Sequence, residues 1–272
     1  MGLAINHKTV YQYTSAVFVE PQYLYFYPAH RNYLKVIDFQ INVEPEPSGL
    51  SFRLDPENNP YHQCWFHESL NQLVIEVEMK LETNEFNPFN FFIERAAKSS
   101  DLEALDRYLS KEPLKEEIIE WIHDIADRSE NNPLTLLTYL CKEIHSGWEH
   151  TLRYEPTLMD ISDCFNQKKG SCRDLSWMMI QMCRSLQIPA RFVSGYAYNP
   201  ELEEGHELHA WVECWLPGAG WIGLDPGTGL LATHQYIPVA VSYLPEKTFP
   251  VQGSFRGNAG AELSFEVSIR ID

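Results

Sequence analysis

The sequence has no long apolar run. No stretch of its 272 residues approaches the roughly 18 consecutive apolar residues that a membrane-spanning helix needs. The first residues, Met1 to Lys8, also lack the apolar segment of a secretory signal. We therefore expect a soluble protein, and the simplest location for it is cytoplasmic.

Basic residues are scarce. The chain has 21 Lys and Arg residues against 38 Asp and Glu residues, which gives a formal net charge of −17. Nucleic acids and anionic membrane surfaces both select proteins with a basic surface. The charge therefore predicts no nucleic-acid partner and no membrane partner. Nothing in the sequence predicts the oligomeric state.

Paired metal-binding or disulfide motifs are missing. No two cysteines form a C-x-x-C pair, and their wide spacing in a long chain does not fit a disulfide framework. His206 and His209 are not four residues apart, as a helical zinc site requires. No loop of alternating acidic residues predicts calcium. We expect free thiols, no metal and no other cofactor. The cysteines are Cys64, Cys141, Cys164, Cys172, Cys183 and Cys214.

What the sequence does contain is a cysteine at the predicted start of a helix. Gly170 permits a tight turn, Ser171 is a good N-cap, and Pro189 lies beyond the helix end. A helix N-terminus favours the thiolate, which is the nucleophilic form of Cys172. Apolar residues follow at helical spacing: Leu175, Met178, Met179, Met182, Cys183 and Leu186.

A histidine and an aspartate follow on two predicted strands. His209 lies near the start of the segment from residue 207 to 216, and Asp225 lies at the end of the segment from residue 220, with a Pro217-Gly218 turn between the two segments. Opposed side chains on paired antiparallel strands lie roughly 5 Å apart. Asp225 can therefore orient His209, which takes the thiol proton from Cys172 and returns it to a leaving amine.

Each of these residues has an ordinary structural explanation when taken singly. An isolated cysteine is usually a small buried residue, an isolated histidine is usually structural, and an aspartate before proline is common in turns. The ordered set on a helix, a strand and a strand favours catalysis by Cys172, His209 and Asp225.

Four short segments resemble the motifs of the bacterial transglutaminase-like superfamily, a papain-like group often described as cysteine proteases. The strand from His7 to Thr14 with Glu20-Pro21-Gln22 resembles the N-terminal β-domain of these proteins. By this resemblance Cys172, His209 and Asp225 are the catalytic triad. The segments are Gly170-Ser171-Cys172-Arg173-Asp174, Ser194-Gly195-Tyr196, His209-Ala210-Trp211-Val212-Glu213 and Leu224-Asp225-Pro226.

One position departs from the family pattern, and the oxyanion hole is incomplete. Arg173 stands where relatives often have glutamine, which leaves substrate preference open and makes Arg173 a candidate substrate-binding residue. The Cys172 backbone N–H is a natural oxyanion donor. Trp148 is a candidate second donor because its indole can only donate, although large rings more often belong to the core.

The pattern of apolar residues changes once along the chain. Alternation up to about residue 83 predicts an antiparallel β-sandwich, and helical periodicity follows. The expected fold is α+β, with this sandwich before a papain-like, transglutaminase-like core of helices packed on an antiparallel sheet. We predict an N-terminal domain over 1–95, a helical connection over 96–130, a catalytic core over 131–235 and a C-terminal tail over 236–272. The tail ends in a strand whose sheet the sequence does not identify.

Three functions remain open on the sequence alone. The first is hydrolysis of an amide, peptide or isopeptide bond through a thioester, which we favour because water is abundant. The second is transfer of the acyl group to an amine, as in transglutaminases, which requires a dedicated amine pocket. The third is a non-catalytic binding module. The expected partner is a peptide, a protein or another amide-containing substrate.

Overall fold

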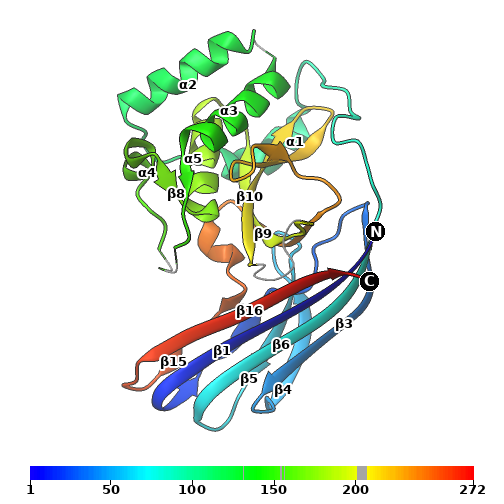
Figure 1. The fold of residues 1–272 in the computed structure, drawn as a ribbon, viewed down its shortest axis with the longest axis vertical. Coiled ribbons are helices and arrows are strands. Elements are labelled where there is room, and N and C mark those ends of the chain that lie inside the picture. Colours follow the sequence, from blue (N-terminus) through cyan, green and yellow to red (C-terminus); the bar gives the residue numbers. More distant parts are fainter. Residues whose placement is uncertain (131, 154, 156, 201–206) are drawn as a thin grey trace.

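Two antiparallel sheets with a shared apolar core form the lower part of the molecule in Figure 1. The computed structural model describes residues 1–130, 132–153, 155, 157–200 and 207–272. The larger sheet contains β1 (Gly2–Val19), β3 (Leu34–Glu44), β6 (Leu70–Thr83), β15 (Phe255–Arg256) and β16 (Ala261–Ile271). The smaller sheet contains β2 (Gln22–Leu24), β4 (Gly49–Leu54), β5 (Pro60–Trp65) and β14 (Val251–Gln252). The predicted antiparallel sandwich is confirmed.

Alternating side chains explain this arrangement. In β6, Val77, Met79 and Leu81 are buried, whereas Glu78 and Lys80 between them are exposed. One face of this strand therefore packs into the sandwich and the other faces water.

The last strand pairs with the first. β16 lies antiparallel to β1, from Leu3 opposite Ile271 to Tyr13 opposite Ala261. The predicted tail, 236–272, is not one unit, because β13 (Tyr236–Ser242) belongs to the other sheet system and β16 to the N-terminal sheet. The boundary expected at residue 235 thus cuts across a strand pairing. The reason is that β9 and β1 both offer free edges to strands from the end of the chain.

The upper part of the molecule is a second antiparallel sheet covered by helices (Figure 1). The strands run in the order β12 (Leu230–Leu231), β11 (Gly220–Asp225), β10 (His209–Leu216), β9 (Ala190–Ala197) and β13. The helices are α1 (Ser99–Leu105), α2 (Glu116–Arg128), α3 (Pro133–Gly147), α4 (Ile161–Gln167) and α5 (Cys172–Ser185), with short 3-10 turns η1 (Asp106–Leu109) and η2 (Pro245–Thr248). The predicted core of helices on an antiparallel sheet is confirmed.

Helix α5 is the central helix of this core. It packs against β9 and β10, and its residues from Leu175 to Met182 are almost completely buried. A two-stranded parallel ladder, β7 (Glu149–His150) with β8 (Lys169–Gly170), brings the end of α3 next to the start of α5. No helix in the described part of the chain is long and apolar enough to cross a membrane.

The two sheet systems are joined by a buried seam. Tyr196 of β9 and Val239 of β13 belong to the same apolar cluster as Ile5 of β1. The buried His7 ring bridges the seam, with Nδ1 2.9 Å from the Tyr196 hydroxyl and Nε2 2.9 Å from the Thr9 hydroxyl. The first and last strands therefore hold the core in a defined position.

Candidate active site

Cys172 is the first residue of α5, as the sequence predicts. Asp174 accepts hydrogen bonds from the Ser171 backbone N–H at 2.9 Å and the Ser171 hydroxyl at 2.7 Å. Arg153 donates to both oxygens of the same carboxylate, at 2.7 and 2.8 Å. These contacts fix the turn into α5, because the buried carboxylate has only one geometry that satisfies all its donors.

His209 and Asp225 lie together beside this helix start. His209 Nε2 is 2.7 Å from Asp225 Oδ2, and Asp225 has no exposed surface. The same carboxylate accepts the Tyr236 hydroxyl at 2.8 Å and the Gly227 backbone N–H at 2.8 Å. Burial alone would raise the pKa of Asp225, but the His209 charge and these donors hold it below its usual value. Asp225 is therefore ionised and keeps the His209 ring in one orientation.

The other ring nitrogen of His209 can form a hydrogen bond with the Cys172 sulfur. Burial acts against the charged imidazole, but Asp225 and Cys172 together raise the pKa of His209 well above 6.5. Burial likewise opposes the Cys172 thiolate, yet hydrogen bonds from His150 and His209 lower the pKa of Cys172 to about 6. The geometry thus favours a thiolate paired with imidazolium near neutral pH.

His150 is a second imidazole at the same thiol, and the sequence analysis missed it. Its hydrogen bond with Cys172 is the largest cause that raises the pKa of His150, ahead of the burial that opposes it. His150 ends β7, which pairs with the segment directly before Cys172. A two-residue parallel ladder leaves no periodic trace in a sequence, so only the histidine itself was visible.

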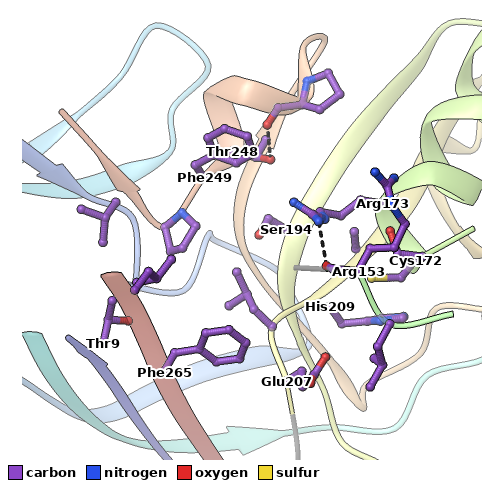
Figure 2. A pocket seen from close by; sticks show the side chains of 18 of the residues that line it. Thr9, Arg153, Cys172, Arg173, Ser194, Glu207, His209, Thr248, Phe249 and Phe265 are labelled. Atoms are coloured by element: carbon purple, nitrogen blue, oxygen red, sulfur yellow. Dashed lines mark hydrogen bonds between the residues drawn. The ribbon is translucent and has the colours of Figure 1, made fainter. Parts of the chain in front are cut away.

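A cleft of about 460 Å³ opens in front of Cys172. One side carries Cys172, His150 and His209, and the opposite side carries residues of β1 and β16. Figure 2 shows Phe265 and Thr9 across the opening from Cys172. A volume in the range of about 300–1,000 Å³ is typical of ligand pockets. The described thiol thus faces a cavity that can admit a substrate segment.

Comparison with known proteins identifies two regions of the chain. A family described as the bacterial transglutaminase-like N-terminal region matches residues 3–82, and the transglutaminase-like superfamily matches residues 120–226, which include the Cys172, His209 and Asp225 segment. Residues 120–226 thus match the core of the transglutaminase-like superfamily, and residues 3–82 match the N-terminal region found in its bacterial members.

Two relatives are similar in sequence to part of this chain. Protein ML0607 of Mycobacterium leprae, described as uncharacterised, is 32% identical over 113 residues, which cover 39% of this chain and 39% of that protein. The protein-glutamine gamma-glutamyltransferase of Pseudomonas aeruginosa is 35% identical over 103 residues, covering 35% of this chain and 14% of the relative. The chain thus spans well under half of either relative.

One solved structure is similar over nearly the entire length. A candidate cysteine protease from Cytophaga hutchinsonii has a TM-score of 0.74 and 17% sequence identity, covering 99% of this chain and 90% of that one. At this level of identity the likeness shows the fold, including the N-terminal sheets next to the transglutaminase-like core.

Trp148 lies in the transglutaminase-like core but does not reach the site. Its indole N–H donates to the Cys164 carbonyl oxygen at 2.9 Å, and its ring packs against Trp121 and Phe165. The Lys168 amine lies 3.5 Å from the ring centroid. The candidate role of Trp148 as second oxyanion donor does not fit this hydrogen bond, because its only donor is already used inside the core. The alternative, a core aromatic, describes it.

Arg173 lines the cleft but is engaged with the protein itself. Its guanidinium donates to the carbonyl oxygens of Arg153 at 3.1 Å and Glu155 at 2.8 Å. It therefore ties the segment before α4 to the start of α5. A role in substrate binding stays a prediction.

Proposed function

We propose that this transglutaminase-like chain is a cysteine-nucleophile enzyme that cleaves an amide bond in a peptide, a protein or another amide-containing substrate. The proposal rests above all on one observation: the Cys172 thiol, with its lowered pKa, lies beside His209, which is held by the buried Asp225.

The reaction begins with attack of the Cys172 thiolate on the amide carbonyl carbon. The carbonyl electrons move to oxygen, and the Cys172 backbone N–H at the first turn of α5 is free of a helical partner and can stabilise that oxyanion. Imidazolium His209 then gives its proton to the leaving nitrogen as the carbon–nitrogen bond breaks. The products of this half-reaction are a thioester on Cys172 and a free amine.

The second half-reaction consumes water. Neutral His209 takes a proton from a water molecule as its oxygen attacks the thioester carbon. Collapse of the intermediate breaks the carbon–sulfur bond, releases a carboxylic acid and restores the thiolate–imidazolium pair. Asp225 keeps the same His209 tautomer through both halves.

The alternative is that an amine, and not water, resolves the thioester. The resemblance to a protein-glutamine gamma-glutamyltransferase of Pseudomonas aeruginosa favours this as the second candidate. Hydrolysis and acyl transfer can be distinguished by incubating the enzyme with a glutamine-containing peptide, in the presence and in the absence of a primary alkylamine. Hydrolysis yields glutamate peptide in both, whereas transfer yields the amine adduct at the expense of glutamate.

The first test of the mechanism is the rate at which iodoacetamide alkylates each cysteine between pH 4.5 and 9. We expect Cys172 to react with a midpoint near pH 6, because its pKa is lowered to about 6, and to plateau above it. In His209→Ala the midpoint should rise above about pH 8, since burial is then opposed only by His150 and the Ala210 backbone N–H.

The buried cysteines are the internal controls for this measurement. Burial raises the pKa of Cys64 to about 11, so Cys64 should stay unreactive over the entire range unless the protein unfolds. A Cys172 that reacts only above pH 8 in the wild-type protein would contradict the proposed enzyme and favour a binding module.

A further inference from the structure

One face of β16 is apolar along most of its length, yet only part of it is covered. Val267 and Ile269 are buried, at 4% and 2% exposure. Leu263 and Phe265 lie on the same face of the strand, since side chains two residues apart share a face, but they are 53% and 42% exposed. The seam with the core therefore continues as an open apolar surface.

The open part of this face forms one wall of the Cys172 cleft. Both Leu263 and Phe265 line the cavity, and the strand register places Tyr11 and Thr9 of β1 directly beside them. Phe249, which follows η2, borders the same cavity. In Figure 2, Phe249 and Phe265 lie on the side away from Arg173 and Cys172.

The two arginines that line the cleft both donate hydrogen bonds within the protein. Arg153 donates to Asp174, and Arg173 donates to backbone carbonyls. Glu207 is a carboxylate among the described residues at this opening. The four wall residues Thr9, Tyr11, Leu263 and Phe265 carry no charge, so apolar contact is the main interaction that the wall offers.

We propose that the β1–β16 face is a specificity wall that binds an apolar side chain, aromatic or branched aliphatic, of the acyl donor next to the amide that Cys172 attacks. This inference rests on the proposed function of Cys172 but concerns binding. The N-terminal sheet is then a part of the substrate site and not only a support. The cavity of about 460 Å³ has room for such a side chain together with the backbone that carries it.

The test is equilibrium binding of fluorescently labelled peptide amides to full-length Cys172→Ala protein, read by anisotropy. Each peptide is a glycine tetramer with one position changed to Phe, Leu, Asp or Lys. We expect Phe or Leu at one position to lower Kd by on the order of tenfold relative to Gly or Asp, as one filled apolar pocket does. Leu263→Ser with Phe265→Ser should reduce that preference to less than about threefold, and Phe265→Leu should retain it.

Two matched substitutions serve as controls. Ile271 is 62% exposed on the same face of β16, and Phe52 is 46% exposed on β4, and neither lines the cleft. Ile271→Ser and Phe52→Ser should therefore leave the preference unchanged. Loss of the preference in these variants would show that apolar peptides bind elsewhere, and would overturn the proposal.

The outcomes also separate this inference from the enzyme itself. Equal Kd values for the Phe, Leu and Gly peptides would overturn the proposed specificity wall. A preference for the Lys peptide that is lost in Glu207→Gln would also overturn it. Either result leaves the proposed enzyme standing if Cys172 of the wild-type protein is alkylated with a midpoint near pH 6. A tenfold apolar preference with an unreactive Cys172 would keep the wall and discard the enzyme.

Discussion

At Cys172, burial and two imidazoles act on the thiol in opposite directions. Burial in a low-dielectric site disfavours the thiolate, and His150 and His209 together more than compensate, which lowers the pKa to about 6. The charge on the sulfur therefore depends on neighbours contributed by two other segments of the chain, β7 and β10. We therefore expect substitutions at those neighbours to act mainly by changing the pKa of the Cys172 thiol.

The first prediction concerns the order of losses within the triad. Cys172→Ala should lower kcat/KM on an amide substrate at least about 10³-fold, and His209→Ala nearly as much, because nucleophile and base act as a unit. Asp225→Asn should lose on the order of 10²-fold, since His209 remains but its orientation does not. Steady-state kinetics gives the values, and circular dichroism checks that each variant is folded. Wild-type kcat/KM in Asp225→Asn would argue against the orienting role of Asp225.

The second prediction concerns His150. Because its side chain donates toward the Cys172 thiolate, His150→Gln should raise the pKa of Cys172 and move the acidic limb of the kcat/KM profile upward by about one pH unit. The plateau at higher pH should change less than the limb. His123→Gln, an exposed histidine of α2, is the control and should leave the profile in place. An unchanged limb in His150→Gln would assign His150 a purely structural role.

At the scale of elements, β9 lies between β13 and β10, the strand that carries His209, and β9 and β13 approach each other closely. Gly195 of β9 lies opposite His209 in the register, and a Cβ there would be 2.2 Å from the Ile237 carbonyl oxygen. The strands can pass each other here only because this residue has no side chain.

The third prediction compares two glycines. Gly195→Ala should lower the free energy of unfolding by about 1–3 kcal/mol, because backbone atoms of β13 must move. Gly147→Ala, at the end of α3, meets nothing within 4 Å and should be neutral or stabilising by up to about 1 kcal/mol. Urea unfolding measures both. If Gly195→Ala unfolds at the same urea concentration as wild type, β13 is not held against β9 as described.

Much of the element order could be predicted from the sequence, and the exceptions share a cause. The helix behind Cys172 and the strands of His209 and Asp225 show local periodicity, which is visible without the fold. The partner of β16 could not be predicted because it lies about 250 residues earlier in the chain. His150 was missed because a two-residue ladder, β7 with β8, has no period. The two roles considered for Trp148 stayed open because the direction of its N–H depends on tertiary packing.

At the scale of the molecule, His7 makes the seam between the two sheet systems sensitive to acid. Burial lowers the pKa of His7 to about 4, from near 6.5 for a histidine in the unfolded chain. Between these two values the unfolded state binds more protons, so the stability that neutral His7 contributes is complete above pH 6.5 and is lost as the pH falls toward 4.

The fourth prediction follows from this loss of stability at low pH. His7 should account for about 2 kcal/mol of the stability lost between pH 7.5 and pH 5, which follows from a pKa of 4 folded and 6.5 unfolded. In His7→Gln the loss over this interval should be smaller by that amount, because the amide does not titrate and can still hydrogen-bond Tyr196 and Thr9. Urea unfolding of both proteins at the two pH values measures the difference. If the free energy of unfolding falls equally in the two proteins, groups other than His7 make the seam sensitive to acid.

The pairing of β1 with β16 also has a consequence for the order in which the protein is made. Synthesis proceeds from the N-terminus, so β1 can pair with β6 on one edge long before β16, its partner on the other edge, exists, and the complete core is translated between β6 and β16. Until then β1 has an unpaired edge, which is the part of a nascent sheet most prone to wrong pairing. The Cys172 helix and its histidines are in place earlier than Leu263 and Phe265. A nascent chain can thus carry a reactive thiol before it has the strand that faces it.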